Sequence, residues 1–276
     1  NLSLPFVGEI PLKTDAGKNK STHTNKSIVI KQGSRDIINE AFRVLRTNLE
    51  FMLDAKIENK ASVTLFTSFN PGSGKSFLTM NTAATFAMKG KRILVIDGDL
   101  RRGSASAYLG SQHKGLSDYL GKRESCLDAL VQENPDIPGF FLLPAGTIPP
   151  NPTELLAEPL FKETIEQLRG HYDYILIDCP PIDIVADTQI IEKLADRTVF
   201  VVRAGLLERD MLSELQRMYD EKRFKNMALL LNGTEGGGNR YGYRYGYKYG
   251  YKYGYGSKNY YKSVSYTHLT LPTSDL

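Results

Sequence analysis

The sequence predicts a doubly wound α/β domain built around a mostly parallel sheet. Six short apolar runs alternate with segments of helical periodicity between residues 34 and 232, which is the order that successive βα units produce. The runs are apolar throughout and do not alternate with polar residues, as expected for parallel strands that are covered on both faces. A glycine-containing loop joins the first run to a helix, as in many sheets of this class.

Each element can be assigned from its own pattern. Strands are expected at 63–67, 92–97, 140–143, 174–178, 198–202 and 227–231. Helices are expected at 76–89, 153–169, 187–195 and 208–223. Before the first strand, an amphipathic helix is expected from a cap at Ser34 to about residue 53. Its apolar face consists of Ile38, Ala41, Phe42, Leu45 and Leu49.

The net charge of +4 is unevenly distributed. Six of the 35 basic residues and one of the 31 acidic residues lie in 239–276, so this tail carries +5 and the remainder −1. A general nucleic-acid-binding surface would make the folded part basic as well, and we therefore expect no nucleic-acid partner. No apolar run approaches the roughly 18 to 20 residues that cross a bilayer.

Three segments lie outside the predicted domain of residues 34–232. Residues 1–33 are polar apart from one apolar patch, which predicts a linker with at most a short docking strand. Residues 233–262 contain a period-four repeat, RYGYRYGYKYGYKYGY, whose glycines and lack of aliphatic residues argue against a packed structure. Residues 263–276 resemble a translated cloning remnant and are excluded. Because the chain begins with Asn1, we expect it to be a segment of a longer protein.

The main chemical motif is FNPGSGKS, between the first strand and the following helix. Its small residues let backbone N–H groups approach a phosphate chain, with a helix N-terminus behind them. Lys75 can reach the β- and γ-phosphates, and the Ser76 hydroxyl can bind Mg²⁺. Phe69 stands where the first glycine of such loops is usual. The predicted nucleotide-binding residues are Pro71, Gly72, Ser73, Gly74, Lys75, Ser76 and Phe77.

Carboxylates follow two of the predicted strands. Asp97 and Asp99 end the run RILVIDGDLRR, and Asp178 ends YILIDCPP. A single Asp at a strand end is usually only a turn former. Ligands of open α/β sheets bind outside the carboxyl ends of the strands, so these three acids should converge on the loop of Lys75. One or two carboxylates suffice for Mg²⁺, which keeps several waters.

These motifs resemble those of the bacterial tyrosine kinases (BY-kinases), the cytoplasmic kinase domains of capsule and exopolysaccharide co-polymerases. The family's Walker A, A′ and B motifs match SFNPGSGKS, ILVIDGDLRR and YILIDCPP. Its E-x-x-R-x-x-R motif matches Glu40, Arg43 and Arg46, and its tyrosine-rich C-terminus matches 241–261. PPNPTELL is also similar to the family, and LPFVGEIP resembles its segment just after the second membrane helix, which implies that residues 1–33 are a juxtamembrane linker. The resemblance covers essentially residues 4–261.

The resemblance implies a P-loop NTPase fold of the partition and cell-division ATPase-like type, and an ATP-dependent protein-tyrosine autokinase. Lys75 would neutralise phosphate charge, and Asp97 is the candidate for accepting the tyrosyl proton. Ser76, Asp99 and, through water, Asp178 would hold Mg²⁺. This sparse set is adequate because phosphoryl transfer requires mainly positioning and charge neutralisation. The implied phosphoacceptors are Tyr241, Tyr243, Tyr245, Tyr247, Tyr249, Tyr251, Tyr253, Tyr255, Tyr260 and Tyr261.

The resemblance also implies partners. We expect a homo-oligomeric ring in which each subunit offers its tail to a neighbour's active site. A membrane-embedded activator in cis, a phosphotyrosine phosphatase and the polysaccharide export machinery are the other implied partners. The implied location is the cytoplasmic face of the bacterial inner membrane, and the implied role is regulation of capsular or exopolysaccharide polymerisation and export.

The polar stripe of Glu40, Arg43 and Arg46 has two interpretations. Spacing alone favours a solvated, salt-bridged helix face. Two arginines and a glutamate also suit a charge-paired subunit contact, and the family motif favours this second interpretation.

Two other functions remain open. A partition or cell-division ATPase switch would carry a second, signature lysine in the loop, where this chain has Asn70, and would have no use for a tyrosine tail. An RNA-binding or self-associating protein could use the alternating Arg and Tyr of the repeat as stacking platforms.

Overall fold

The computed structural model describes residues 3–12, 28–52, 60–110, 113–182, 186–208 and 210–235. These residues include most of the predicted α/β domain. The ten candidate phosphoacceptor tyrosines, the segment 263–276 and most of the linker predicted at 1–33 lie outside the described residues.

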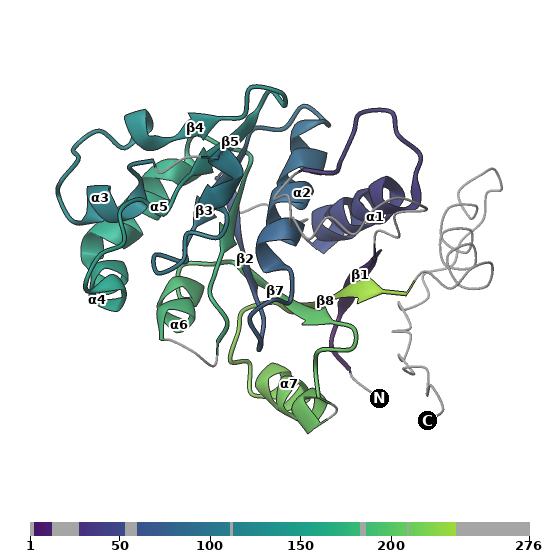
Figure 1. The fold of residues 1–276 in the computed structure, drawn as a ribbon. Coiled ribbons are helices and arrows are strands. Elements are labelled where there is room, and N and C mark those ends of the chain that lie inside the picture. Colours follow the sequence, from purple (N-terminus) through teal and green to yellow (C-terminus); the bar gives the residue numbers. More distant parts are fainter. Residues whose placement is uncertain are drawn as a thin grey trace, which may run out of the picture.

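The described residues form one eight-stranded sheet in the order β1-β8-β7-β2-β6-β3-β5-β4 (Figure 1). Neighbouring strands pair in parallel, except β4 and β5, which are antiparallel. The strands are β1 (Phe6–Pro11), β2 (Ser62–Thr67), β3 (Ile93–Asp97), β4 (Gln132–Glu133), β5 (Phe140–Leu143), β6 (Tyr174–Asp178), β7 (Arg197–Arg203) and β8 (Met227–Thr234). The predicted mostly parallel α/β fold is therefore confirmed.

The six predicted strands correspond to β2, β3, β5, β6, β7 and β8. The short docking strand allowed for in the N-terminal segment is β1, which pairs in parallel with β8 at one edge of the sheet. The other edge strand, β4, spans only two residues and shows no periodicity from which it could be predicted.

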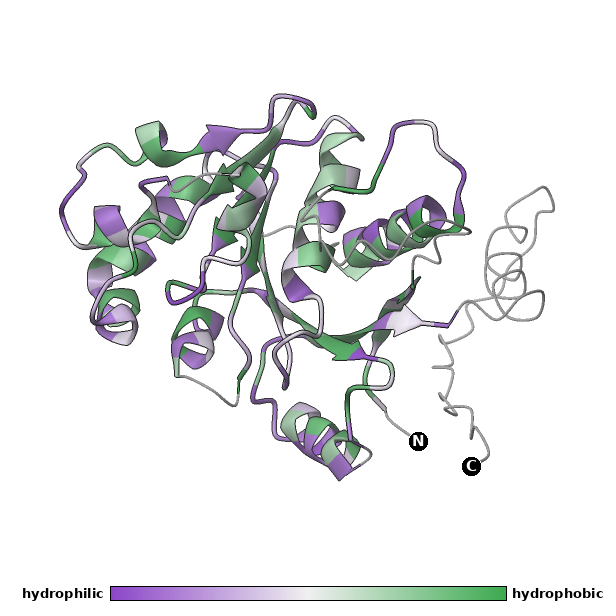
Figure 2. Cartoon of the chain, viewed as in Figure 1, coloured by the Kyte–Doolittle hydropathy of each residue, from purple (hydrophilic) through white to green (hydrophobic). Residues whose placement is uncertain are grey.

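Helices cover both faces of the sheet (Figure 1). The α-helices are α1 (Ile37–Met52), α2 (Lys75–Ala87), α3 (Leu116–Leu120), α4 (Pro152–Ala157), α5 (Pro159–Arg169), α6 (Asp187–Glu192) and α7 (Asp210–Asp220). Helices α1 and α2 share one buried apolar cluster with one face of the sheet, α3 to α6 share a second cluster with the opposite face, and α7 packs on a third with β7 and β8. Figure 2 shows the central strands as hydrophobic and the outer helices as two-sided.

The first helix begins later than the sequence indicated. The predicted cap at Ser34 is wrong, because α1 starts at Ile37 and Asp36 caps it. The Asp36 carboxylate accepts the backbone N–H of Asn39 at 2.9 Å, which satisfies one of the free N–H groups of the first turn. The Ser34 hydroxyl in turn donates to the Asp36 carboxylate at 2.6 Å.

The predicted helix at 153–169 is two helices. Glu158 separates α4 from α5 and has extended backbone angles, with φ −64° and ψ 144°. The cause is Pro159, which disfavours helical geometry in the residue before it and begins a new helix at its own position. The prediction of one continuous helix is therefore wrong at Glu158, although Pro159 in the sequence indicated the break.

Among the described residues, no helix has the length and apolar character that spanning a bilayer would require.

Helix α1 allows a matched test of what holds the domain together. Leu45 is fully buried in the cluster under α1, whereas Ile37, on the same helix, is 75% exposed. We expect Leu45→Ala to lower the free energy of unfolding by about 2–5 kcal/mol, since it leaves a cavity. Ile37→Ala should change it by no more than about 0.5 kcal/mol. Urea denaturation of both variants measures the difference, and equal losses would contradict the assigned orientation of α1.

Candidate active site

The phosphate-binding loop connects β2 to α2 and includes two glycines with positive φ. Gly72 has φ +77° and Gly74 has φ +91°, a region that side chains disfavour. A Cβ at Gly74 would also lie 2.2 Å from the Asn232 side-chain nitrogen. Two independent reasons therefore require glycine at position 74: its backbone angle and the close approach of Asn232. The loop ends at the N-terminus of α2, where free N–H groups and the helix dipole favour an anion.

Two residues from distant strands hold the loop in place. The Asn232 amide, on β8, donates to the carbonyl of Ser73 at 2.8 Å. The Arg203 guanidinium, at the end of β7, donates to the carbonyl of Gly72 at 3.0 Å. Neither residue was predicted from the sequence, because each is separated from the loop by more than a hundred residues. The only available signal was that both lie at the carboxyl end of a predicted strand.

Phe69, which replaces the usual first glycine, anchors the loop. Its side chain is 3% exposed and lies edge-on against Phe200 of β7, with ring centroids 4.8 Å apart. Such aromatic pairs stabilise packing beyond the area they bury. The departure from the usual motif thus ties the start of the loop to the apolar cluster under α7.

Lys75, the first residue of α2, is only 9% exposed. Its ammonium donates to the Ser68 hydroxyl at 3.1 Å. Burial lowers the pKa of Lys75, while the nearby carboxylates of Asp178 and Asp99 act in the opposite direction. The ammonium carries three N–H donors, and its described hydrogen bond goes to a neutral hydroxyl, so it can donate a charge-assisted hydrogen bond to a phosphate group at the helix N-terminus.

The acids predicted to converge do lie together. Asp97 on β3 and Asp178 on β6 are paired in register on neighbouring parallel strands, and Asp99 follows two residues after Asp97. Burial raises the pKa of Asp97 to about 6, with Asp99 adding to the shift. The carboxylate of Asp97 accepts both the backbone N–H and the hydroxyl of Ser106 at 2.6 Å, and these bonds limit the shift.

Asp178 lacks such support. It is 1% exposed, and neither of its carboxylate oxygens has a hydrogen-bond partner of normal geometry among the described residues. Burial, followed by the charge of Asp97, raises its pKa to about 8, although the Ser76 hydroxyl and Lys75 are near enough to oppose the shift. An orphaned buried carboxylate beside a serine hydroxyl fits a hard cation such as Mg²⁺.

Asp99 is 6% exposed and accepts the backbone N–H groups of Arg101 and Arg102 through one oxygen, at 3.2 and 3.1 Å. Within the described residues, no group of three or more His, Cys, Asp or Glu side chains is placed so that it could hold a metal ion. Mg²⁺ beside a nucleotide needs only one or two carboxylates, because phosphate oxygens and water complete its shell.

The remaining predicted loop residues have different roles. Pro71 and Gly72 are exposed, Ser73 is buried and its hydroxyl donates to the Asn70 carbonyl, and Ser76 is half-buried. The Phe77 side chain packs edge-on against Phe42 of α1, with centroids 6.0 Å apart. Only the backbone of Phe77 therefore belongs to the loop.

Two further site residues were not predicted from the sequence. Ser106 connects Asp97 to the segment just after β5, because its hydroxyl also accepts the N–H of Ala145 at 2.8 Å. Tyr108, on the same 3₁₀ turn (Ser106–Leu109), is half-buried near Asp178, and burial together with that carboxylate raises its pKa. Both follow the Asp97–Asp99 motif in a short segment that has no regular periodicity.

The polar stripe on α1 is not uniformly solvated. Glu40 and Arg43 pair with each other and are 52% and 33% exposed, but the Arg46 side chain is 18% exposed. Arg46 turns toward α2 and donates to the carbonyl of Thr85 at 3.3 Å. The stripe therefore does not lie next to the phosphate-binding loop, but against the far end of α2.

A phosphate-binding loop at a helix N-terminus, a buried lysine and carboxylates at the carboxyl edge of a parallel sheet define a P-loop NTPase domain. Residues 62–223 match the AAA domain family. The chain is 32% identical to the tyrosine-protein kinase YwqD of Bacillus subtilis, covering 79% of this chain and 90% of that protein. The chain belongs to the bacterial tyrosine kinases.

Solved structures agree with this assignment. The BceF tyrosine kinase domain is 34% identical, with a TM-score of 0.71 over 84% of this chain and 94% of that one. Some relatives are much longer: the tyrosine-protein kinase etk of Escherichia coli is 31% identical over 80% of this chain, which spans only 30% of etk.

The two buried carboxylates predict how stability depends on pH. Their pKa values, about 6 and about 8, lie above the usual 3.8, so the folded state binds more protons than the unfolded state. Without nucleotide and Mg²⁺, the free energy of unfolding should therefore fall as pH rises from about 4 to about 8. Asp178 accounts for the part between pH 6 and 8, on the order of a few kcal/mol at most.

Asp178→Asn should remove that part, so that the variant gains stability relative to the parent between pH 6 and 8. Asp136→Asn, at an exposed loop position, is the matched control and should keep the parent's slope. Urea denaturation in EDTA at a series of pH values measures all three. Parallel curves for the parent and Asp178→Asn would show that Asp178 is not a buried carboxylate with a raised pKa.

Proposed function

We propose that this chain is an ATP-dependent autokinase that phosphorylates the tyrosines of its own C-terminal tail. The observation that carries the proposal is the convergence of Lys75, Asp99 and Asp178 at the N-terminus of α2, each at least nine-tenths buried. A low-exposure site with one cation and several acids suits phosphoryl transfer, which depends on positioning and charge neutralisation.

Each residue of the site has a proposed role toward ATP. Lys75 leaves the Ser68 hydroxyl and contacts the terminal phosphates, and the backbone of residues 71–77 surrounds the phosphate chain. Ser76, Asp99 and, through water, Asp178 are the residues that would hold Mg²⁺. When bound, Mg²⁺ neutralises the charge that develops on the transferred phosphoryl group.

Asp97 is the proposed acceptor of the tyrosyl proton. A pKa of about 6 suits a general base that works near neutral pH. The carboxylate is fully buried and bonded to Ser106. A tyrosine hydroxyl therefore reaches Asp97 only when the segment that carries Ser106 moves aside, which would couple substrate entry to exposure of the base.

The proposed acceptors are tyrosines of a neighbouring subunit in a homo-oligomeric ring. In support, α1 exposes three large apolar residues seven positions apart, Ile37 at 75%, Val44 at 49% and Phe51 at 72%. They lie beside the pair formed by Glu40 and the half-buried Arg43, so this surface of α1 combines an apolar strip with charges, as subunit contacts do. A second copy of the chain is the proposed occupant.

The proposed cellular role is regulation of capsular or exopolysaccharide polymerisation and export, at the cytoplasmic face of the bacterial inner membrane. A membrane-embedded activator in cis, a phosphotyrosine phosphatase and the export machinery are the proposed partners. The family relationship supports this setting.

Lys75→Met tests the site. Incubated with Mg-ATP, the variant should lose phosphotyrosine by a factor of about 10²–10³ or more, because the charge that faces the developing phosphate is gone. Lys162→Met, an exposed lysine on α5, is the control and should leave phosphorylation unchanged. Mass spectrometry of the tail counts the modified tyrosines. Parent-level phosphotyrosine in Lys75→Met would refute the assignment of the loop.

Replacing Glu40, Arg43 and Arg46 together by Ala tests assembly. We expect light scattering to show a monomer where the parent forms a larger species, with reduced phosphorylation in trans and unchanged ATP binding. The matched control replaces Glu214, Arg217 and Arg223, a Glu-Arg-Arg group on and just after α7, whose side chains are 30%, 60% and 43% exposed. An unaltered oligomer in the first variant would contradict the subunit contact and support the interpretation of the stripe as a solvated helix face.

A further inference from the structure

One buried carboxylate takes no part in the roles proposed for the site. Asp187, the first residue of α6, has a fully buried side chain, although a carboxylate is costly to bury unless it is paired. One of its oxygens accepts the Thr153 hydroxyl at 2.5 Å, and the other accepts the Nε–H of Arg101 at 3.1 Å. Asp187 therefore joins α6 both to α4 and to the turn that follows β3.

The three side chains form a closed triangle of hydrogen bonds. A second nitrogen of Arg101 donates to the Thr153 hydroxyl at 3.0 Å, so each member contacts both of the others. Because a guanidinium presents its donors in a rigid fork, two acceptors at fixed positions hold it in one orientation. The triangle thereby restrains Arg101 and the backbone that carries it.

The backbone of Arg101 acts directly on Asp99. Its N–H and that of Arg102 donate to the same carboxylate oxygen of Asp99, at 3.2 and 3.1 Å. The turn is closed by the N–H groups of Arg102 and Gly103, which donate to the Asp99 carbonyl at 3.2 and 2.8 Å. A carboxylate that is held in place before a cation arrives loses less conformational freedom on binding it.

The next residue of α6 contacts the segment that carries the other acid. The Thr188 hydroxyl donates to the carbonyl of Pro180 at 2.9 Å, and the Thr67 hydroxyl, at the end of β2, donates to the same carbonyl at 2.9 Å. Both threonines are fully buried, and Pro180 comes two residues after Asp178. The first turn of α6 thus contacts the segments of both acids on the metal side of the site.

We propose that Asp187 is a positioning residue for the magnesium side of the site. Through Arg101 it holds the turn in which Asp99 accepts two backbone N–H groups, and so sets Asp99 before the cation binds. The inference rests on the proposed function, because it takes Asp99 as a Mg²⁺ ligand. If the ion pair only tied α6 to its neighbours, its loss would lower stability and leave the turn unchanged.

A second ion pair of the same geometry provides a matched control. Arg123 and Asp118 are also joined through Nε at 3.1 Å, with a buried carboxylate and a guanidinium that is 47% exposed, against 41% in the pair of Asp187. The other hydrogen bonds of the Asp118 carboxylate come from the backbone N–H groups of residues 115 and 147. Asp118→Asn therefore disturbs an equivalent pair away from the turn.

Amide hydrogen exchange of the full chain, in EDTA and without nucleotide, measures the turn directly. The asparagine of Asp187→Asn has a single acceptor oxygen and cannot accept from both partners. Exchange at the N–H groups of Arg101 and Arg102 should therefore become several-fold faster, because the turn opens more often. Asp118→Asn should match the parent at these two positions. Equal exchange in the parent and Asp187→Asn would overturn the proposal.

Calorimetry with ADP, in Mg²⁺ and in EDTA, measures the consequence for the cation. The ratio of the two affinities reports what Mg²⁺ contributes. Asp187→Asn should reduce this ratio about tenfold and leave the affinity in EDTA unchanged, whereas Asp118→Asn should keep the parent's ratio. An equal fall in both affinities would identify a structural role and overturn the proposal. A parent that gains nothing from Mg²⁺ would refute the magnesium role of Asp99 in the proposed function, and amide exchange would then decide the positioning by Asp187 on its own.

Thr153 separates the hydrogen bonds from packing. Thr153→Ser keeps the hydroxyl and should retain the parent's ratio of affinities. Thr153→Val keeps the shape but removes one bond from Asp187 and one from Arg101, so it should reduce the ratio several-fold. The opposite order, with Thr153→Ser the more damaging, would show that the methyl group matters and the triangle does not, which would also overturn the proposal.

Discussion

The register between β3 and β6 is the constraint on which the site depends. It places Asp97 and Asp178 side by side, in a position from which water is excluded by helices on both faces of the sheet. Two like charges in such a place cannot both ionise cheaply, and Ser106 supports only one of them. The protein therefore maintains one carboxylate that is hydrogen-bonded and one that is not. This asymmetry makes Asp178, and not Asp97, the group that a bound cation would relieve.

The regular part of the fold could be predicted from the sequence because apolar runs and glycine loops are local signals. The strand ends that carry Asp97 and Asp178 were found correctly, since a parallel sheet must bring them to one edge. The contacts of Asn232 and Arg203 with the loop could not be found. They depend on which strands become neighbours, and no local sequence signal indicates that β7 pairs with β2 and β8 with β7. The break at Glu158 was predictable from Pro159. The cap at Asp36 was not, because Ser34 and Asp36 both suit a capping position and lie three and one residues before the start of α1.

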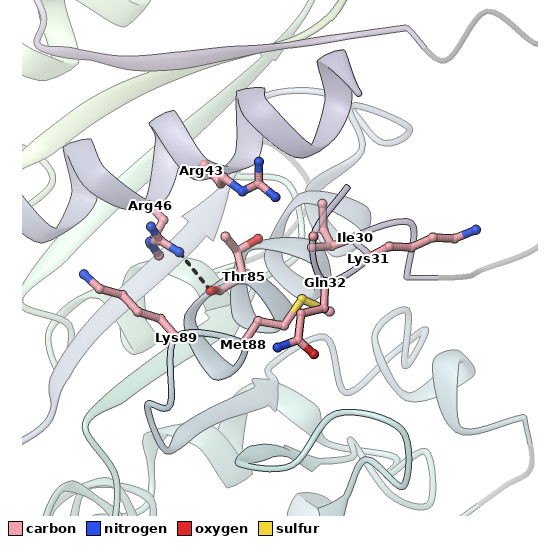
Figure 3. A pocket seen from close by; sticks show the side chains of 9 residues that line it. Ile30, Lys31, Gln32, Arg43, Arg46, Thr85, Met88 and Lys89 are labelled. Atoms are coloured by element: carbon pink, nitrogen blue, oxygen red, sulfur yellow. Dashed lines mark hydrogen bonds between the residues drawn. The ribbon is translucent and has the colours of Figure 1, made fainter. Parts of the chain in front are cut away.

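Helix α1 presents three different surfaces. One packs on the sheet through Phe42, Leu45 and Leu49, which are almost completely buried. A second exposes Ile37, Val44 and Phe51, and a third turns Arg46 toward α2. A helix with apolar residues on two sides cannot satisfy both by folding alone. Arg46 contacts the C-terminal end of α2, which is the end remote from the phosphate-binding loop (Figure 3). A displacement of α2 would therefore be felt by α1, whose exposed apolar surface is available to bind another molecule.

Helix α2 is buried along almost its whole length, from Lys75 to Ala87. One end of this helix forms part of the phosphate-binding loop and the other end contacts Arg46 of α1, with no exposed turn between them that could absorb a displacement. Any shift of this helix on nucleotide binding must alter the carbonyl that Arg46 contacts. Thermodynamic linkage then requires reciprocity: if nucleotide changes the affinity of α1 for another molecule through this contact, that molecule changes the affinity for nucleotide by the same factor.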